Sequence, residues 1–306
     1  MLYLLLFVFL IGVFIAGMFL MRSGLYSLTG ENLKEWLYRL TNRPIKGMIA
    51  SILVTGVLQS SSAVMVLTVG LVSAGALAFP QTIGIILGTN IGTTFTAEFM
   101  TFPLDEYVVY FMIIGAFLIV LTRGKLRATG VIFLGIGMIF TAMRGFKWIA
   151  DPLSSLEFVH QGFLMMNDSI AISVLIGIIF TALIQSSSAT TGILMSFLMA
   201  GTIGLESGIA AMLGANIGTC VTGWMASIGA RKEAKLTAYA HIWLNVVGVF
   251  VFLPFVTYLA DIVQSWSTSP AVQLAHASVV FNVFSSLLVL PFASQFGHFI
   301  EKVHGR

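Results

Sequence analysis

The chain has 306 residues, of which 58% are hydrophobic and 9% are charged, and its mean hydropathy is +1.00. Because soluble proteins carry about 25% charged residues, this composition excludes a soluble globular protein and predicts an all-α polytopic membrane protein. The net charge of +3 comes without a dense Lys/Arg run, which excludes a nucleic-acid-binding patch. Cys220 is the single cysteine, which excludes an intrachain disulfide and a cysteine-based metal site.

The first twenty residues are apolar. They lack the basic start of a signal peptide, and no clear small-x-small cleavage site precedes Arg22. We interpret residues 1–20 as a retained first span with the N-terminus outside, and a cleaved signal peptide is the alternative. The following segment, 22–46, carries five basic and two acidic residues between spaced apolar ones. We expect it to form an amphipathic helix on the membrane surface.

Seven segments are apolar over close to the roughly 20 residues that a helix needs to cross the bilayer. The predicted full spans are 2–20, 80–101, 107–122, 128–143, 203–228, 237–259 and 271–296. The last two share a pattern in which an Asn precedes a Pro-Phe pair by nine residues, at Asn245 and Asn282. We expect the whole chain, 1–306, to form one transporter domain.

Two polar motifs occur twice with the same spacing. Gln59-Ser60-Ser61-Ser62-Ala63 recurs 126 residues later as Gln185-Ser186-Ser187-Ser188-Ala189. Gly88-Thr89-Asn90-Ile91-Gly92-Thr93 recurs at the same offset as Gly214-Ala215-Asn216-Ile217-Gly218-Thr219. A shared offset indicates an internal repeat, which we place at about 47–122 and 169–259.

The two segments that hold the serine motifs, 47–77 and 169–201, are too long for ordinary spans. As helices they would measure about 46–50 Å, against a hydrocarbon core of ~30 Å. We therefore predict that each is a re-entrant hairpin of two half-helices broken near the midplane. Three spans then separate the hairpins, so the second repeat is inverted relative to the first. If the segments were full spans, the repeats would be parallel. Loop charge does not distinguish these two arrangements. The hairpin arrangement places 13 of the 15 Lys/Arg on the cytoplasmic side, and the full-span arrangement places 12 there.

Runs of hydroxyl residues inside apolar sequence need a physical reason, because polar groups are costly in hydrocarbon. Ser61, Ser62, Ser187 and Ser188 are predicted N-caps of the half-helices. Two helix N-termini that meet near the midplane would bind a small anion through N–H and hydroxyl groups. The predicted anion ligands are Ser60, Ser61, Ser62, Ser186, Ser187 and Ser188.

The amide and threonine residues of both motifs offer uncharged oxygens, which suit alkali cations. The predicted sodium ligands are Gln59, Gln185, Asn90, Thr93, Asn216 and Thr219. His241 and Asn245 are four residues apart on one helix face, where they either brace the site or pair with each other. Small polar residues also line ordinary helix contacts. Glu98 is either a coupling group or, near the end of its span, a residue that faces water, and we favour the second reading. For His276 we favour a structural role.

The duplicated Q-S-S-S-A and G-[TA]-N-I-G-T motifs, followed by H-x-x-x-N, resemble the type II sodium/phosphate cotransporter family over roughly residues 45–296. The resemblance implies sodium-driven phosphate uptake by alternating access, with the serine motifs forming the phosphate and sodium sites. Three features depart from the family pattern. Ile242 stands where some electrogenic relatives have an acidic residue, Ser278 stands where a second histidine would be expected, and the sequence stops at Arg306. We therefore expect that the C-terminal regulatory domain of many bacterial relatives is absent.

These observations predict a sodium-coupled symporter of inorganic phosphate in the cell inner (plasma) membrane, with a cytoplasmic C-terminus. The expected partners are phosphate, sodium and the lipid bilayer, with no nucleic acid, no cofactor and no transition metal. The alternatives are a transporter of another small oxyanion and a passive anion channel. An intramembrane serine hydrolase is disfavoured because no carboxylate is placed to orient His241. The sequence leaves the oligomeric state open, with a homodimer as one option.

Overall fold

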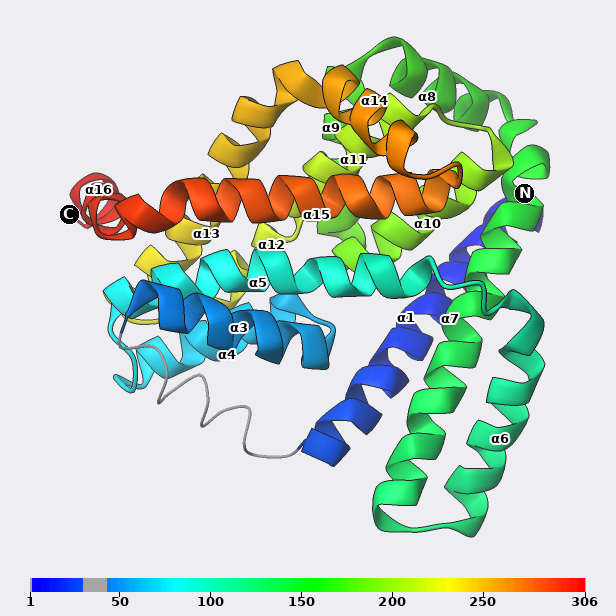
Figure 1. Cartoon of the computed structure of the whole chain (residues 1–306), viewed down its shortest axis with the longest axis horizontal. Helices are drawn as coiled ribbons and strands as arrows, with labels where there is room; N and C mark the ends of the chain where they lie inside the picture. The colour runs from blue at the N-terminus through cyan, green and yellow to red at the C-terminus, as the bar shows by residue number, and fades with distance from the viewer. Residues whose placement is uncertain (1, 30–42, 306) are drawn as a thin grey trace.

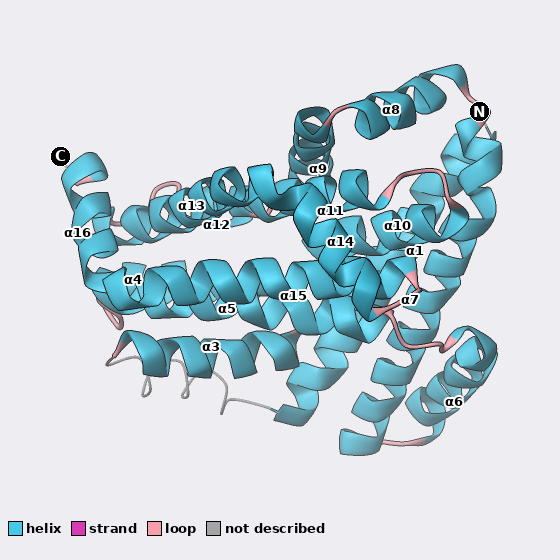
Figure 2. Ribbon diagram, turned by 45° about the horizontal axis from the view of Figure 1, so that its top comes forward, coloured by secondary structure: helices cyan, strands magenta, loops and turns pink. Residues whose placement is uncertain are grey.

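The computed structural model describes residues 2–29 and 43–305. Helices make up most of these residues and none of them forms a strand (Figure 2). With so few charged side chains, the chain can satisfy its backbone groups in a bilayer only through internal hydrogen bonds, which helices provide. The predicted class, an all-α multi-pass membrane protein, is confirmed.

Three helices form one end of the molecule, where the N-terminus lies (Figure 1). They are α1 (Leu2–Thr29), α6 (Val108–Leu121) and α7 (Gly124–Ser154). α7 contacts both α1 and α6. The approach to α1 is close: a Cβ on Gly17 would lie 2.8 Å from the carbonyl oxygen of Gly135. A short amphipathic helix, α8 (Glu157–Asp168), then leads into the second repeat.

The two repeats contain corresponding helices in the same order. The first consists of α3 (Pro44–Leu58), α4 (Ser61–Ser73) and α5 (Phe79–Met100). The second consists of α9 (Ile170–Ile184), α10 (Ser187–Ala200) and α11 (Leu205–Gly218), which continues after Thr219 as α12 (Cys220–Ala226). α3 packs on α5 and α9 packs on α11, so both copies use the same helix pairing.

The C-terminal region is two kinked helices. α13 (Lys232–Phe252) continues through a 3-10 turn (Leu253–Phe255) into α14 (Val256–Trp266). α15 (Pro270–Val289) continues in the same way through Leu290–Phe292 into α16 (Ala293–His304). Proline cannot donate a helical hydrogen bond, which explains both kinks. α15 lies beside α5 through the middle of the molecule (Figure 1).

Fewer of the described helices qualify as candidate spans, by length and composition, than the seven spans that we predicted from the sequence. Five of the described helices are long and apolar enough to cross a membrane, or six if the bent pair α5 and α6 counts as one span. The axes of α5 and α6 differ by 70°, with Pro103 in the break between them. α6 has 14 residues, or about 21 Å of helix, which is shorter than the ~30 Å core.

The boundaries of the predicted surface helix at 22–46 are also wrong where the structure describes them. Residues 22–29 continue α1, and residues 44–46 begin α3. Residues 30–42 lie outside the described part of the chain.

Candidate functional site

Each serine motif lies at a helix break, as the sequence predicted. Gln59 and Gln185 are the two non-glycine residues with positive φ among the described residues, at 52° and 53°. Each ends a half-helix in the left-handed conformation, which is unfavourable for a residue with a Cβ. The same strained conformation at both glutamines makes the duplicated break a defined feature of the fold.

The helix caps lie one or two residues earlier than expected. Ser60 and Ser186, rather than Ser61, Ser62, Ser187 or Ser188, are the N-caps. Ser60 Oγ accepts a hydrogen bond from the Ala63 N–H at 3.1 Å, and Ser186 Oγ accepts one from the Ala189 N–H at 3.2 Å. The next two serines of each motif therefore lie in the first helical turn, where the hydroxyls are not used for capping.

The chain reverses direction at the second break. The hydroxyls of Thr181 and Thr190 lie 2.7 Å apart, whereas nine residues of straight helix would separate them by about 13 Å. α9 and α10 are therefore the two arms of a hairpin. At the first break, α3 and α4 also contact each other and lie side by side (Figure 1).

A small cavity lies where helices of the two repeats meet α15. Its volume is about 10 Å³, which holds roughly one water molecule. Four predicted site residues line it: Thr93 from α5, Ser187 and Ser188 from α10, and Asn216 from α11. None of the described residues in its wall is charged.

The other predicted residues do not line this cavity. They are Gln59, Ser60, Ser61, Ser62, Asn90, Gln185, Ser186, Thr219, His241 and Asn245. In this conformation the structure therefore brings together the second serine motif and the α5 part of repeat one, but not the first serine motif.

Three hydroxyl residues in the cavity wall were missed by the sequence analysis: Thr96, Thr191 and Ser278. Thr96 is 1% exposed, and its Oγ1 has no hydrogen-bond partner among the described residues. Helical spacing could have found two of the three, since Thr96 and Thr191 each follow a predicted residue by three positions. Ser278 could not have been found this way, because it belongs to another helix.

Asn245 connects the second motif of repeat one to α13. The amide of Asn90 donates to Asn245 Oδ1 at 3.2 Å, and the amide of Asn245 donates to the carbonyl oxygen of His241 at 2.9 Å. The His241 side chain takes no part in these bonds. Asn245 therefore braces Asn90, while His241 contributes only its backbone.

A basic side chain lies at the tip of the first hairpin, which the sequence analysis did not expect. Nε of Arg22, from α1, donates to the carbonyl oxygen of Gln59 at 2.9 Å. The Gln59 amide donates to the carbonyl oxygen of Gly56. Because α1 continues past residue 20, Arg22 is part of this helix rather than of a surface segment.

Glu98 and His276 approach each other across α5 and α15. His276 Nε2 lies 3.9 Å from Glu98 Oε1, and both side chains are about one-third exposed. The contact joins the helix that carries Thr93 and Thr96 to the helix that carries Ser278. Neither residue lines the cavity, and the roles of Glu98 and His276 stay predictions.

The glycines of the second motif permit close helix packing in both repeats. A Cβ on Gly88 would lie 2.2 Å from the carbonyl oxygen of Met48, and one on Gly214 would lie 2.1 Å from that of Val174. Backbone atoms cannot yield as a flexible side chain would. These contacts fix α5 against α3 and α11 against α9, and so set the position of the cavity wall.

A larger polar hollow adjoins the cavity at Met100, which lines both. It has a volume of about 630 Å³ and includes Arg144, Lys147, Asp105 and Asp151 in its walls. Met100 is 3% exposed, and it belongs to the walls of both the hollow and the cavity.

The cavity wall offers uncharged oxygens and N–H groups. Within residues 2–29 and 43–305, no cluster of three His, Cys, Asp or Glu side chains is placed to hold a metal ion. Hydroxyl and amide oxygens suit a hard alkali cation, while hydroxyls near a helix N-terminus suit an anion.

The sequence matches the family model described as Na+/Pi-cotransporter over residues 13–147 and 156–269. The chain belongs to the Na+/Pi-cotransporter family. This membership agrees with the resemblance seen in the duplicated motifs and associates the chain with phosphate transport.

Curated relatives of this family member cover it to different extents. A Bacillus subtilis protein, "Uncharacterized protein YqeW", is 45% identical over 302 residues, or 98% of each chain. "Putative inorganic phosphate export protein YjbB" of Escherichia coli is 26% identical over 94% of this chain and 53% of its own length. The chain thus spans about half of YjbB.

An animal relative matches a shorter part of the chain. "Sodium-dependent phosphate transport protein 2A" of Ovis aries is 31% identical over 144 residues, which are 42% of this chain and 22% of that protein. No solved structure matches the chain.

Proposed function

We propose that this protein is a sodium-coupled symporter of inorganic phosphate that works by alternating access. The observation that carries the proposal is the small cavity between the repeats, whose wall combines Ser187, Ser188, Thr93, Thr96 and Asn216 without a charged residue among its described members. Family membership and the printed names of the relatives support phosphate as the substrate.

The uncharged wall favours cation coupling over a passive anion pore. A phosphate ion taken into a low-dielectric site without a cationic side chain would carry a large desolvation penalty. Sodium ions bound beside it would offset its charge, and the unpartnered Thr96 Oγ1 provides one oxygen for them. We propose that the remaining amide and threonine residues of the motifs complete the sodium sites.

The cavity size favours a conformational cycle. A volume of about 10 Å³ is too small for an ion of five heavy atoms, since it holds only about one water. Phosphate must therefore enter when the walls separate. We propose that the hollow beyond Met100 is the entry route from outside, and that Ser60, Ser61 and Ser62 join the site when the repeats move.

The proposed orientation places the protein in the plasma membrane with its N-terminus outside and its C-terminus in the cytoplasm. The direction of net flux follows the combined gradients of sodium and phosphate. Import is expected with an inward sodium gradient, and efflux is expected under phosphate excess.

The direct test is uptake of radiolabelled phosphate into proteoliposomes with an imposed sodium gradient. We expect Ser188→Ala and Ser62→Ala each to lower uptake at least tenfold, because each removes a hydroxyl that binds the anion or its sodium ion. Ser196→Ala is the matched control. Ser196 is on α10 but its hydroxyl donates within the helix to the Gly192 carbonyl oxygen at 2.8 Å, so this variant should transport normally.

Uptake at the wild-type level in both Ser188→Ala and Ser62→Ala would refute the site assignment. Uptake that persists when potassium replaces sodium would refute the coupling and favour a passive pore. Stronger competition by sulfate than by unlabelled phosphate would show that another oxyanion is the substrate.

A further inference from the structure

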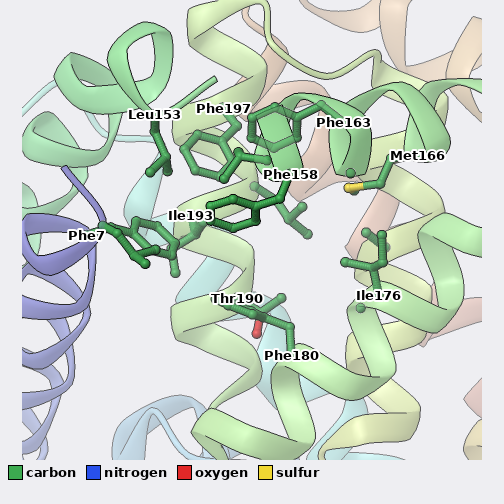
Figure 3. Close-up of a pocket in the computed structure, with 16 residues that line it drawn as sticks. Phe7, Leu153, Phe158, Phe163, Met166, Ile176, Phe180, Thr190, Ile193 and Phe197 are labelled. Atoms are coloured by element: carbon green, nitrogen blue, oxygen red, sulfur yellow. The ribbon is translucent and has the colours of Figure 1, made fainter. Parts of the chain in front are cut away.

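A second cavity lies apart from the candidate transport site, under α8 and between α1, α9 and α10. Its volume is about 330 Å³. Aromatic and aliphatic side chains point into it, among them Phe7, Phe158, Phe180, Ile193 and Phe197 (Figure 3). Cavities of this size and composition typically bind apolar ligands.

The cavity wall contains almost no free polar group. Of the described residues that line it, only Thr190 has a hydroxyl, amide or charged side chain, and its Oγ1 already lies 2.7 Å from that of Thr181. An apolar cavity of this kind stays dry. Phosphate, sodium and other polar ligands are therefore excluded as occupants.

The cavity continues the apolar outer surface of α8 and α9. Phe158, which lines it, is 63% exposed, and on α9 Leu175, Ile179 and Leu183 are 53%, 50% and 75% exposed. In a membrane-spanning protein, side chains of this kind face lipid hydrocarbon. The medium in contact with the cavity mouth is therefore the lipid tail region.

α8 has the character of a helix that lies in the membrane interface. Its exposed positions include Glu157, His160, Gln161 and Asp168. Phe163 and Met166 point toward the cavity (Figure 3), and Val159 also lines it. Such a helix lies at the boundary between headgroups and acyl chains. A lipid whose headgroup lies beside α8 would have its acyl chain at the depth of the cavity.

We propose that this cavity binds one acyl chain of a membrane phospholipid. The bound chain would pack against both arms of the second hairpin, since α9 and α10 supply Ile176, Phe180, Ile193 and Phe197 to the wall. Ser187 and Ser188 are at the tip of the same hairpin. Any effect of the bound lipid on transport rests on the proposed function. The binding of the acyl chain in the cavity does not depend on that function.

The test uses the full chain in vesicles that contain a phospholipid with a photoreactive diazirine on one acyl chain. After illumination, mass spectrometry locates the crosslinked residues. We expect the crosslinks to concentrate on the cavity wall, on peptides that contain Phe163, Phe180 or Ile193. Crosslinks spread evenly over exposed apolar positions such as Phe117 and Val120 would overturn the proposal, and so would an absence of crosslinks on the cavity wall.

Gly162→Phe provides a variant that fills the cavity. Gly162 lines the cavity, and a Cβ there meets no atom within 4 Å, so the first carbon of a new side chain meets no clash. Gly12→Phe is the matched control, since Gly12 is an exposed helical glycine with equally open space. We expect Gly162→Phe to lower cavity crosslinking at least fivefold and Gly12→Phe to leave it unchanged.

Equal crosslinking in both variants would overturn the proposal. The wild-type crosslink map is decisive even if Gly162→Phe does not fold. Because the crosslinking assay requires no transport, its result is independent of the phosphate uptake assay.

Discussion

The two hairpins differ at one pair of residues that face each other across the break. In the second hairpin these residues are Thr181 and Thr190, whose hydroxyls are hydrogen-bonded at 2.7 Å. The positions 126 residues earlier are Thr55 and Val64. Thr55 is fully buried, and its Oγ1 lacks a partner among the residues that the structure describes. The substitution of one threonine by valine thus leaves a polar group unsatisfied in repeat one.

This asymmetry predicts opposite effects for the same substitution in the two repeats. Thr55→Val removes a buried, unpaired hydroxyl and should stabilise the protein by about 1 kcal/mol, whereas Thr181→Val removes a formed bond and should destabilise it by about 1 kcal/mol. Thermal unfolding of the purified variants in detergent measures both. Shifts of the melting temperature in the same direction would contradict the assigned pairing.

At the scale of helices, the second motif serves packing as well as chemistry. Gly88 and Gly214 place the backbones of α5 and α11 against α3 and α9, with space for hydrogen but not for a methyl group. The same contact occurs in both repeats, since Met48 and Val174 are also 126 residues apart. The position of Asn90 and Asn216, two residues further along, follows from this packing.

Substitution of these glycines by alanine should therefore separate helices that the site requires. We expect Gly88→Ala and Gly214→Ala each to destabilise the protein by about 1–3 kcal/mol or more through overpacking. Gly70→Ala is the control, because a Cβ on this α4 glycine meets nothing within 4 Å and alanine favours a helix by about 1 kcal/mol. Size-exclusion chromatography of detergent extracts measures the folded yield. A normal yield for the Gly88 and Gly214 variants would contradict the close packing.

At the scale of the whole molecule, the sequence predicted features that are local and duplicated. The helix breaks at Gln59 and Gln185 follow from a short pattern that occurs twice. Contacts between distant helices have no such signal. The hydrogen bond from Arg22 to the Gln59 carbonyl oxygen could therefore be found only in the structure.

The cavities and the span count also depended on the structure. Ser278 reaches the candidate site, and the apolar cavity forms, because of how several helices pack together. The 70° bend between α5 and α6 depends on the geometry of a short loop. Apolar composition alone does not reveal any of these features.

The whole-molecule prediction is that the two repeats are inverted relative to each other. The alternative is a pair of parallel repeats, in which the motif segments cross the membrane. Ala78 and Gly204 are equivalent positions, 126 residues apart. Both are exposed, and each is the N-cap of the long helix that follows a hairpin. With the spans predicted from the sequence and the N-terminus outside, two hairpins leave three spans (80–101, 107–122 and 128–143) between these caps, so Ala78 faces the cytoplasm and Gly204 faces outside. If the motif segments cross the membrane, both positions face outside.

Cysteine labelling in intact cells distinguishes these outcomes. Gly204 has an ordinary φ of −77° and its Cβ would meet only Asn167 Oδ1 at 3.6 Å, so Gly204→Cys and Ala78→Cys should both fold. The native Cys220 is buried, and the unsubstituted protein is the background control. We expect an impermeant maleimide added outside to label Gly204→Cys at least tenfold faster than Ala78→Cys, and cell lysis to remove the difference. Equal labelling of both variants in intact cells would establish parallel repeats, and the two hairpins could then not enter the membrane from opposite sides.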